Sequence, residues 1–188
     1  MVTSQTYKLT DYPKEITLRD GARVVLKPMT HSDADALLHF FSRVPPEDWY
    51  YLKEEVTSPK VIQRWAAELD YDRALPLLAW VNERVVADAS LHRTRSLARH
   101  HVGEIRVVVE PEYRNRGLGS ALMRELAGVA TRRGLERLFI EMVSEGEERA
   151  IKVAESLGFV RLAVLPKHAK DLDGNYRDIV LLEMPLGT

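Results

Sequence analysis

Apolar residues recur at spacings of three and four in several stretches of the chain, which is the pattern of helices with one buried face. Thr30 and Ser58 are typical residues to cap the start of the first two long helices, and Pro45 ends the first of them. A strong helix is predicted over Gly117–Arg133, closed by Gly134. The remaining predicted helices are a short one at Glu47–Leu52 and a last one at Glu147–Leu157.

Elsewhere the pattern changes to short runs rich in Val, Ile and Leu, which indicates strands. Short turns such as Asp20-Gly21 join neighbouring strands, so these pairs are expected to be antiparallel. Strand Val102–Val109, the helix after it and strand Arg137–Val143 form a β-α-β unit, which predicts one parallel pair. The other predicted strands are Ile16–Leu18, Arg23–Leu26, Leu77–Val81, Val85–Leu91, Phe159–Leu165 and Tyr176–Met184. The fold class is therefore α/β (α+β) with a mixed, mostly antiparallel central sheet and helices on both faces.

The composition is typical of one globular domain. We expect a polar N-terminal arm over residues 1–15 and a single domain over residues 16–188. The chain has 27 basic and 28 acidic side chains, a formal net charge of −1, which argues against a general nucleic-acid or membrane-surface binder. Its most apolar stretch, Leu75–Val81, is far shorter than the roughly 20 residues of a spanning helix, so we expect a cytoplasmic protein. The absence of cysteine excludes a disulfide scaffold, a thiolate metal site and a cysteine nucleophile.

The candidate chemistry lies where strand Val102–Val109 passes into the helix that starts at Gly117. Residues 114–120 read Arg-Asn-Arg-Gly-Leu-Gly-Ser. Free N–H groups and the positive dipole end make a helix N-terminus an anion site, and glycine lets a phosphate approach the backbone. The two arginines add positive charge. From this local chemistry alone, a pyrophosphate site and a glycine-rich turn that packs strand against helix are equally good interpretations.

Arg114-x-x-Gly117-x-Gly119 after a valine-rich strand resembles the Arg/Gln-x-x-Gly-x-Gly/Ala signature of the GNAT superfamily of acetyl-CoA-dependent N-acetyltransferases. The order of elements and the Leu-Gly-Phe sequence ending at Phe159 are similar to that family too. The resemblance implies the GNAT acyl-CoA N-acyltransferase fold, acetyl-CoA as cofactor, and a strand that splays from its parallel neighbour to expose backbone groups for the pantetheine arm. The residues it implies for cofactor binding are Val107, Val108, Val109, Arg114, Asn115, Arg116, Gly117, Leu118, Gly119 and Ser120.

Glu104 is the best candidate for the base that takes a proton from the amine during acetyl transfer. It lies five residues before Val109, about 17 Å along a strand that rises ~3.3 Å per residue, in the direction of the pantetheine thioester. Its surroundings resemble those of bacterial Pat-type protein lysine acetyltransferase domains, in which the glutamate is taken as the general base. The alternative is a solvent-facing glutamate. The backbone amide of Val107 is the candidate donor to the oxyanion.

Many GNAT enzymes carry a tyrosine acid in the last helix and an asparagine earlier in it. Here these positions are Ala154 and Glu147, so the resemblance supplies no tyrosine acid, as in Pat-type domains. Trp49, Tyr50 and Tyr51 follow the first helix, where GNAT folds commonly form a wall of the acceptor site. An aromatic wall for a substrate and ordinary packing of a short helix are equally good interpretations.

The sequence therefore predicts an enzyme that moves acetyl from acetyl-CoA to a primary amine by direct attack in a ternary complex, since no cysteine can carry the acetyl group. The expected acceptor is a protein lysine or an N-terminal amine. The alternatives are a small amine, such as a polyamine or an aminated antibiotic, and a non-catalytic acyl-CoA-binding sensor. We expect no metal, no nucleic-acid or membrane partner, and a monomer or homodimer.

Overall fold

The computed structural model describes residues 9–94 and 96–187, so residues 1–8 of the predicted arm lie outside the described residues. The strands form one eight-stranded sheet in the order β1-β2-β3-β4-β5-β6-β8-β7. They are β1 (Lys14–Thr17), β2 (Arg23–Pro28), β3 (Ala74–Val81), β4 (Arg84–Arg93), β5 (Val102–Val109), β6 (Arg137–Val143), β7 (Val160–Lys170) and β8 (Tyr176–Pro185). The helices are α1 (Ala34–Arg43), α2 (Pro46–Trp49), α3 (Pro59–Ala67), α4 (Leu118–Arg132) and α5 (Glu148–Ser156), with 3-10 turns η1 (His31–Asp33), η2 (Leu97–Arg99) and η3 (Pro111–Tyr113).

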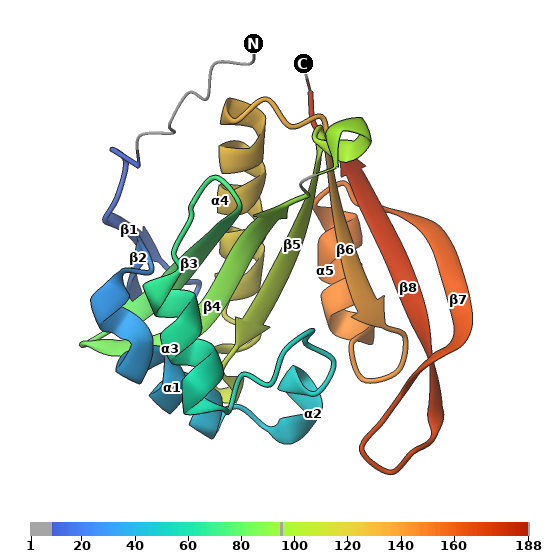
Figure 1. Cartoon of the computed structure of the whole chain (residues 1–188), viewed down its shortest axis with the longest axis horizontal. Helices are drawn as coiled ribbons and strands as arrows, with labels where there is room; N and C mark the ends of the chain where they lie inside the picture. The colour runs from blue at the N-terminus through green and yellow to red at the C-terminus, as the bar shows by residue number, and fades with distance from the viewer. Residues whose placement is uncertain (1–8, 95, 188) are drawn as a thin grey trace.

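The sheet is antiparallel at every junction except one. β5 and β6, joined through α4, run parallel, as the β-α-β pattern predicts. Their ladder has only three residue pairs, from Val102 with Arg137 to Glu104 with Phe139. Figure 1 shows the two strands side by side at one end and separating toward the other, where α2 and the loop after it lie.

Helices cover both faces of the sheet, which confirms the predicted fold class (Figure 1). The larger core packs α4 and α5 against one face, with Leu122 and Ile151 among its buried residues. The smaller core packs α1 and α3 against the opposite face, around Phe40 and Ile62. Because side chains alternate along a strand, β5 serves both cores and can present polar residues to the α1–α3 side.

Most helices begin within about one residue of the predicted start, but Thr30 caps the 3-10 turn η1, and α1 begins only at Ala34. The main-chain N–H and the hydroxyl of Thr30 each donate to Asp33 at 2.8 Å before α1, and Pro59 is the first residue of α3. Gly117 precedes α4 with φ 91°, a conformation that favours glycine. Within residues 9–94 and 96–187, no helix is both long and apolar enough to cross a membrane.

Several strands are longer than the sequence predicts, β3 and β7 among them. β3 begins at Ala74, because Pro76 keeps its place in the strand by accepting a hydrogen bond from the N–H of Met29 through its carbonyl. β7 continues to Lys170 past an irregularity at Lys167, which has φ 55°. Such an irregularity bends a strand without ending it, and residue patterns do not reveal it.

Candidate active site

A pocket of about 620 Å³ lies where β5 and β6 separate, beyond Glu104 and Phe139. Its walls are the end of β5, the end of β6 and the start of α5. Two loops complete it: the β5–α4 loop, residues 110–117, and the α2–α3 loop, residues 50–58. The pocket therefore has one side next to the α4 N-terminus and another next to the α1–α3 layer.

Some main-chain N–H and carbonyl groups of β5 point into this pocket and do not bond to β4. The N–H of Glu110 donates to Val86 of β4 at 3.0 Å, and hydrogen-bonded pairs alternate along an antiparallel ladder. Val107 and Val109 are therefore at non-hydrogen-bonded positions of this ladder, so their N–H and carbonyl groups point away from β4. The carbonyl of Val109 accepts from Arg114 Nε at 2.9 Å, whereas the amide of Val107 faces the gap, as an oxyanion donor would have to.

The amides at the start of α4 form a cradle. Within the described chain, the N–H groups of residues 115–120 donate to no other residue, and the first helical bond runs from Ala121 to Gly117 at 3.0 Å. Asn115 has φ 63°, which helps turn the loop into the helix. A Cβ on Gly119 would meet only Val109, at 3.8 Å. Free amides, open space and the positive helix end together fit a pyrophosphate.

Glu104 lies on the α1–α3 side of the pocket between two cations. Lys53 Nζ is 2.9 Å from one carboxylate oxygen and 3.0 Å from the other, and Arg106 Nε is 2.8 Å away. Burial raises the pKa of Glu104, but the hydrogen bonds from Arg106 and Lys53 outweigh it, so the pKa is below its ordinary value. Glu104 is therefore ionised at neutral pH, and its basicity depends on whether these cations stay.

Comparison with known proteins shows to which family the chain belongs. Residues 35–159 match the family model described as the acetyltransferase (GNAT) family. The chain belongs to the GNAT acetyltransferase family. The resemblance predicted from the signature is thus confirmed, and the pocket between β5 and β6 stays the candidate active site.

Several relatives of this GNAT protein are acetyltransferases. Acetyltransferase PA5475 of Pseudomonas aeruginosa is 26% identical over 151 residues, covering 77% of this chain and 78% of that protein. The alanine N-acetyltransferase of ribosomal protein bS18 from Escherichia coli is 31% identical over 80 residues, 43% of this chain and 53% of that protein. The GNAT domain of S. lividans PAT superposes with a TM-score of 0.79 and 25% identity over 96% of this chain and all of that domain. YncA of Salmonella typhimurium, described with acetyl-CoA, shares the fold (TM-score 0.73, 20% identity, 87% of this chain and 94% of that one).

Most of the predicted cofactor residues of this GNAT protein line the pocket, and a few do not. Those that line it are Val107, Val108, Val109, Arg114, Asn115, Gly117, Gly119 and Ser120. Leu118 is buried, so only its main chain can meet a ligand. Arg116 lies outside the pocket, paired with Asp20 and stacked 4.9 Å from the Tyr113 ring. Cofactor binding by these residues stays a prediction.

Of the three predicted aromatic residues, only Tyr51 lines the pocket. The indole N–H of Trp49 donates to the carbonyl of Val44 at 3.2 Å, and its ring packs on the core beneath α1 and α3. Tyr50 is 41% exposed and meets the edge of Tyr51 at 5.4 Å. Ordinary packing therefore accounts for Trp49, whereas Tyr51 faces the pocket, as a wall of the acceptor site would.

Sequence reasoning missed several charged side chains of the pocket. Lys53 and Arg149 come from a loop and from α5, far from the signature, and Arg149 donates to the Asn115 side chain at 2.6 Å. Asp48 of α2 accepts a hydrogen bond from Arg114 at 2.6 Å. These residues meet only through the fold, and no local spacing marks them.

The position at which many GNAT enzymes carry a tyrosine acid does not line the pocket in this chain. Ala154 lies on the buried face of α5, in the core and not in the pocket. Glu147, at the start of that helix, does line the pocket and accepts the N–H of Val143. Burial raises the pKa of Glu147 against that hydrogen bond, and the charge of Asp48 raises it further. Among the carboxyls that line the pocket, Glu104 and Glu147 thus have pKa values displaced in opposite directions.

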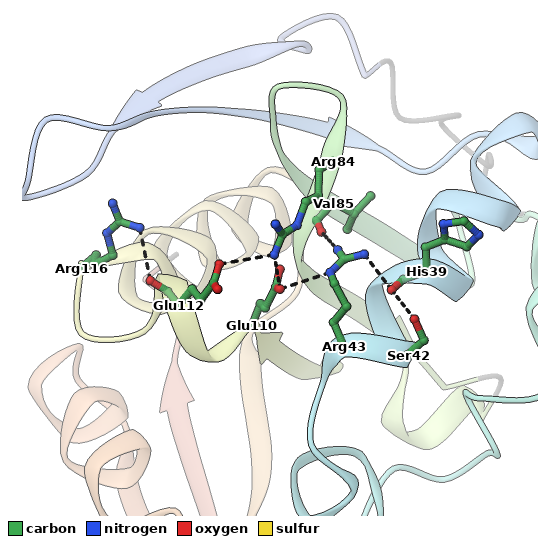
Figure 2. A network of polar contacts seen from close by, with 8 residues as sticks. All are labelled: His39, Ser42, Arg43, Arg84, Val85, Glu110, Glu112 and Arg116. Atoms are coloured by element: carbon green, nitrogen blue, oxygen red, sulfur yellow. Dashed lines mark hydrogen bonds and ion pairs between the residues drawn. The ribbon is translucent and has the colours of Figure 1, made fainter.

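A buried carboxylate fixes the β5–α4 loop to the rest of the molecule (Figure 2). Glu110 is 4% exposed and pairs with Arg43 of α1 at 3.1 Å and with Arg84, the first residue of β4. Arg43 also donates to the carbonyl of Val85 at 2.7 Å. The loop that carries the amide cradle is therefore anchored to α1 and to β4, which holds its geometry in place.

Polar side chains continue from Glu104 along the α1–α3 side of the sheet. On β4, the hydroxyl of Ser90 and Nε2 of His92 are 2.8 Å apart, and burial with nearby Arg106 lowers the pKa of His92 to about 4. Burial raises the pKa of Asp88 to about 7, and one of its oxygens has no hydrogen-bond partner among the described residues. Among residues 9–94 and 96–187, no group of three or more His, Asp or Glu side chains is placed to hold a metal ion.

Proposed function

We propose that this protein is an acetyl-CoA-dependent N-acetyltransferase that acetylates a primary amine by direct attack in a ternary complex. The observation that carries the proposal is the alignment of free amides: those of residues 115–120 at the head of α4, and that of Val107 facing the same pocket. A ligand with a pyrophosphate and an amide-bearing arm matches both sets. Acetyl-CoA has these groups and supplies an activated acetyl thioester.

Each part of the site has a distinct task in this proposal. The amides of residues 115–120 hold phosphate oxygens, and the end of β5 pairs with the pantetheine arm. Glu104 takes a proton from the acceptor amine, directly or through a water molecule, and the N–H of Val107 donates to the oxygen that becomes negative. An acceptor ammonium that displaces Lys53 would leave Glu104 with one cation fewer and therefore with a stronger affinity for the proton.

The acceptor that we favour is a lysine side chain of a protein or an N-terminal amine. The similarity to the GNAT domain of S. lividans PAT covers 96% of this chain, and the bS18 relative is named for acetylating an alanine. The pocket already holds the amine of one lysine side chain, that of Lys53, against Glu104. This proximity supports an extended alkyl amine as acceptor.

The test measures release of the CoA thiol from acetyl-CoA with a panel of lysine peptides, N-terminal peptides, polyamines and aminated antibiotics. We expect turnover with at least one peptide class, and calorimetry should detect CoA binding without any acceptor. Turnover with polyamines or antibiotics alone would replace the favoured acceptor class with small amines. Binding of CoA without turnover on any amine would favour a sensor, and absence of binding would contradict the cofactor assignment.

A further inference from the structure

A primary amine of the chain itself lies against the proposed base. Lys53, in the α2–α3 loop, places Nζ 2.9 Å and 3.0 Å from the two carboxylate oxygens of Glu104. Both residues line the pocket that contains the free amide of Val107. The Lys53 ammonium therefore has the position that the proposed mechanism assigns to the acceptor.

This contact is not needed to neutralise Glu104, because Arg106 already donates to the same carboxylate at 2.8 Å. The side chain of Lys53 is 50% exposed, and an ion pair exposed to that extent contributes little to stability. Residues 50–58 contain no helix or strand of their own. The Lys53 side chain can thus leave Glu104 and approach it again at little cost, as a reacting amine must.

We propose that Lys53 is a self-acetylation site, modified within one chain by acetyl-CoA bound in the same pocket. The proposal rests on the proposed function. Nζ first loses a proton to Glu104, and the neutral amine then forms a bond to the acetyl carbon while the bond from that carbon to sulfur breaks. The sulfur leaves with the electron pair, and the nitrogen loses its second proton. One of the two protons from Nζ ends on the sulfur and the other is released to solvent, so the products are CoA thiol, a neutral acetyl-lysine and one proton.

The modification would alter the site as well as mark it. Acetylation removes the positive charge of Lys53, which leaves Arg106 as the one described cation paired with Glu104. Both cations lower the pKa of Glu104, so losing one raises it and makes the carboxylate a better base. It also clears the acceptor position. We therefore expect the acetylated chain to turn over external amines faster than the unmodified chain.

The experiment incubates the full chain with isotopically labelled acetyl-CoA and no acceptor, then maps acetyl groups by mass spectrometry. We expect one acetyl group at Lys53, with a rate per molecule that does not change on dilution, because the reaction occurs within one chain. Glu104→Gln should slow it by about a hundredfold. Lys60, an exposed residue of α3, is the matched lysine: Lys60→Arg should leave the label unchanged, and Lys53→Arg should remove it.

Two outcomes would overturn the proposal while leaving the proposed function intact. One is a chain that binds acetyl-CoA and acetylates a panel amine but leaves Lys53 unmodified. The other is equal labelling of Lys53 and Lys60 that Glu104→Gln does not slow, since this is simple chemical acetylation. A chain that neither binds acetyl-CoA nor acetylates any amine would instead contradict the proposed function.

A measurement without cofactor tests the contact itself. Carbon-detected NMR of the glutamate carboxyls gives the pKa of Glu104 in the unmodified chain and in Lys53→Met. Because the hydrogen bond from Lys53 lowers this pKa, we expect it to be higher in Lys53→Met and unchanged in Lys60→Met. An unchanged value in Lys53→Met would show that the two side chains do not pair in solution, and the proposal would fail.

Discussion

The β5–α4 loop and the α2–α3 loop border one pocket but are built in different ways. The first offers main-chain amides in a fixed geometry, anchored by the buried carboxylate of Glu110. The second offers side chains, such as Lys53 paired with Glu104 and Glu54 paired with Arg64. Main-chain recognition depends on backbone conformation, so it suits a ligand that a whole family shares. Side-chain recognition can change residue by residue, so it suits an acceptor that differs among members.

The largest effect should come from placing a carboxylate in the amide cradle. Gly117→Asp puts a negative charge where an anion is expected and forces a side chain into φ 91°, so CoA affinity should fall by more than about a thousandfold. Calorimetry with CoA measures this loss. Gly134→Asp is the matched control, because Gly134 also has a positive φ, 72°, but lies at the other end of α4. Similar affinity in both variants would contradict the location of the cradle.

The next effect separates chemistry from binding. Glu104→Gln keeps the shape of the side chain and removes its basicity, so turnover should fall by about a thousandfold while CoA affinity stays within a few fold. Steady-state thiol release and calorimetry on the same preparations measure both quantities. Glu55→Gln, at an exposed carboxyl of the α2–α3 loop, is the control. Unchanged turnover in Glu104→Gln would remove Glu104 from the role of base.

A third effect concerns the charges beneath the α1–α3 side. Burial raises the folded-state pKa of Asp88 to about 7. The folded chain therefore holds a proton that the unfolded chain loses, so the contribution of Asp88 to the free energy of unfolding is greatest below about pH 4 and is lost as pH rises through 7. Asp88→Asn cannot ionise, so at pH 8 its free energy of unfolding should exceed that of the unmodified chain by about 4 kcal/mol, since the pKa is raised by roughly three units and each unit corresponds to ~1.4 kcal/mol. Urea unfolding across this pH range measures the difference. Asp35→Asn, at an exposed carboxyl of α1, keeps Asp88, so its free energy of unfolding should vary with pH as that of the unmodified chain does.

The smallest effect tests the division within the aromatic run. Tyr51 lines the pocket and Tyr50 does not, so Tyr51→Phe should change the KM for the acceptor by about threefold and Tyr50→Phe should leave it alone. Acceptor titrations at saturating acetyl-CoA give both values. A larger effect at Tyr50 would mean that the acceptor approaches over the outer face of the loop.

The sheet topology and the cradle were predictable because both follow from local rules. The β-α-β pattern dictates the parallel pair, and the signature from Arg114 to Gly119 indicates free amides at a helix start. The extra length of β3 and β7 was not predictable, because each depends on a partner elsewhere in the chain.

The acceptor side was only partly predictable. Glu104 could be proposed from its place on the strand and from the resemblance, but its two cationic partners could not. Lys53 precedes Glu104 by 51 positions, and Arg149 reaches Asn115 across 34. A contact over such a separation depends on how loops fold back over the sheet, and no periodicity within one segment encodes it.

The junction between β5 and β6 has a mechanical consequence. Three ladder pairs, the fewest at any junction of the sheet, join the half-sheet of β1–β5 to the half-sheet of β6–β8. Fewer main-chain hydrogen bonds therefore oppose local opening along this line. A ligand that hydrogen-bonds to β5 and fills the gap adds contacts across that line and delays local opening there. Such binding raises the free energy of unfolding by RT ln(1 + [L]/Kd). The resistance of the sheet to opening therefore rises with the concentration of the ligand that binds in the gap.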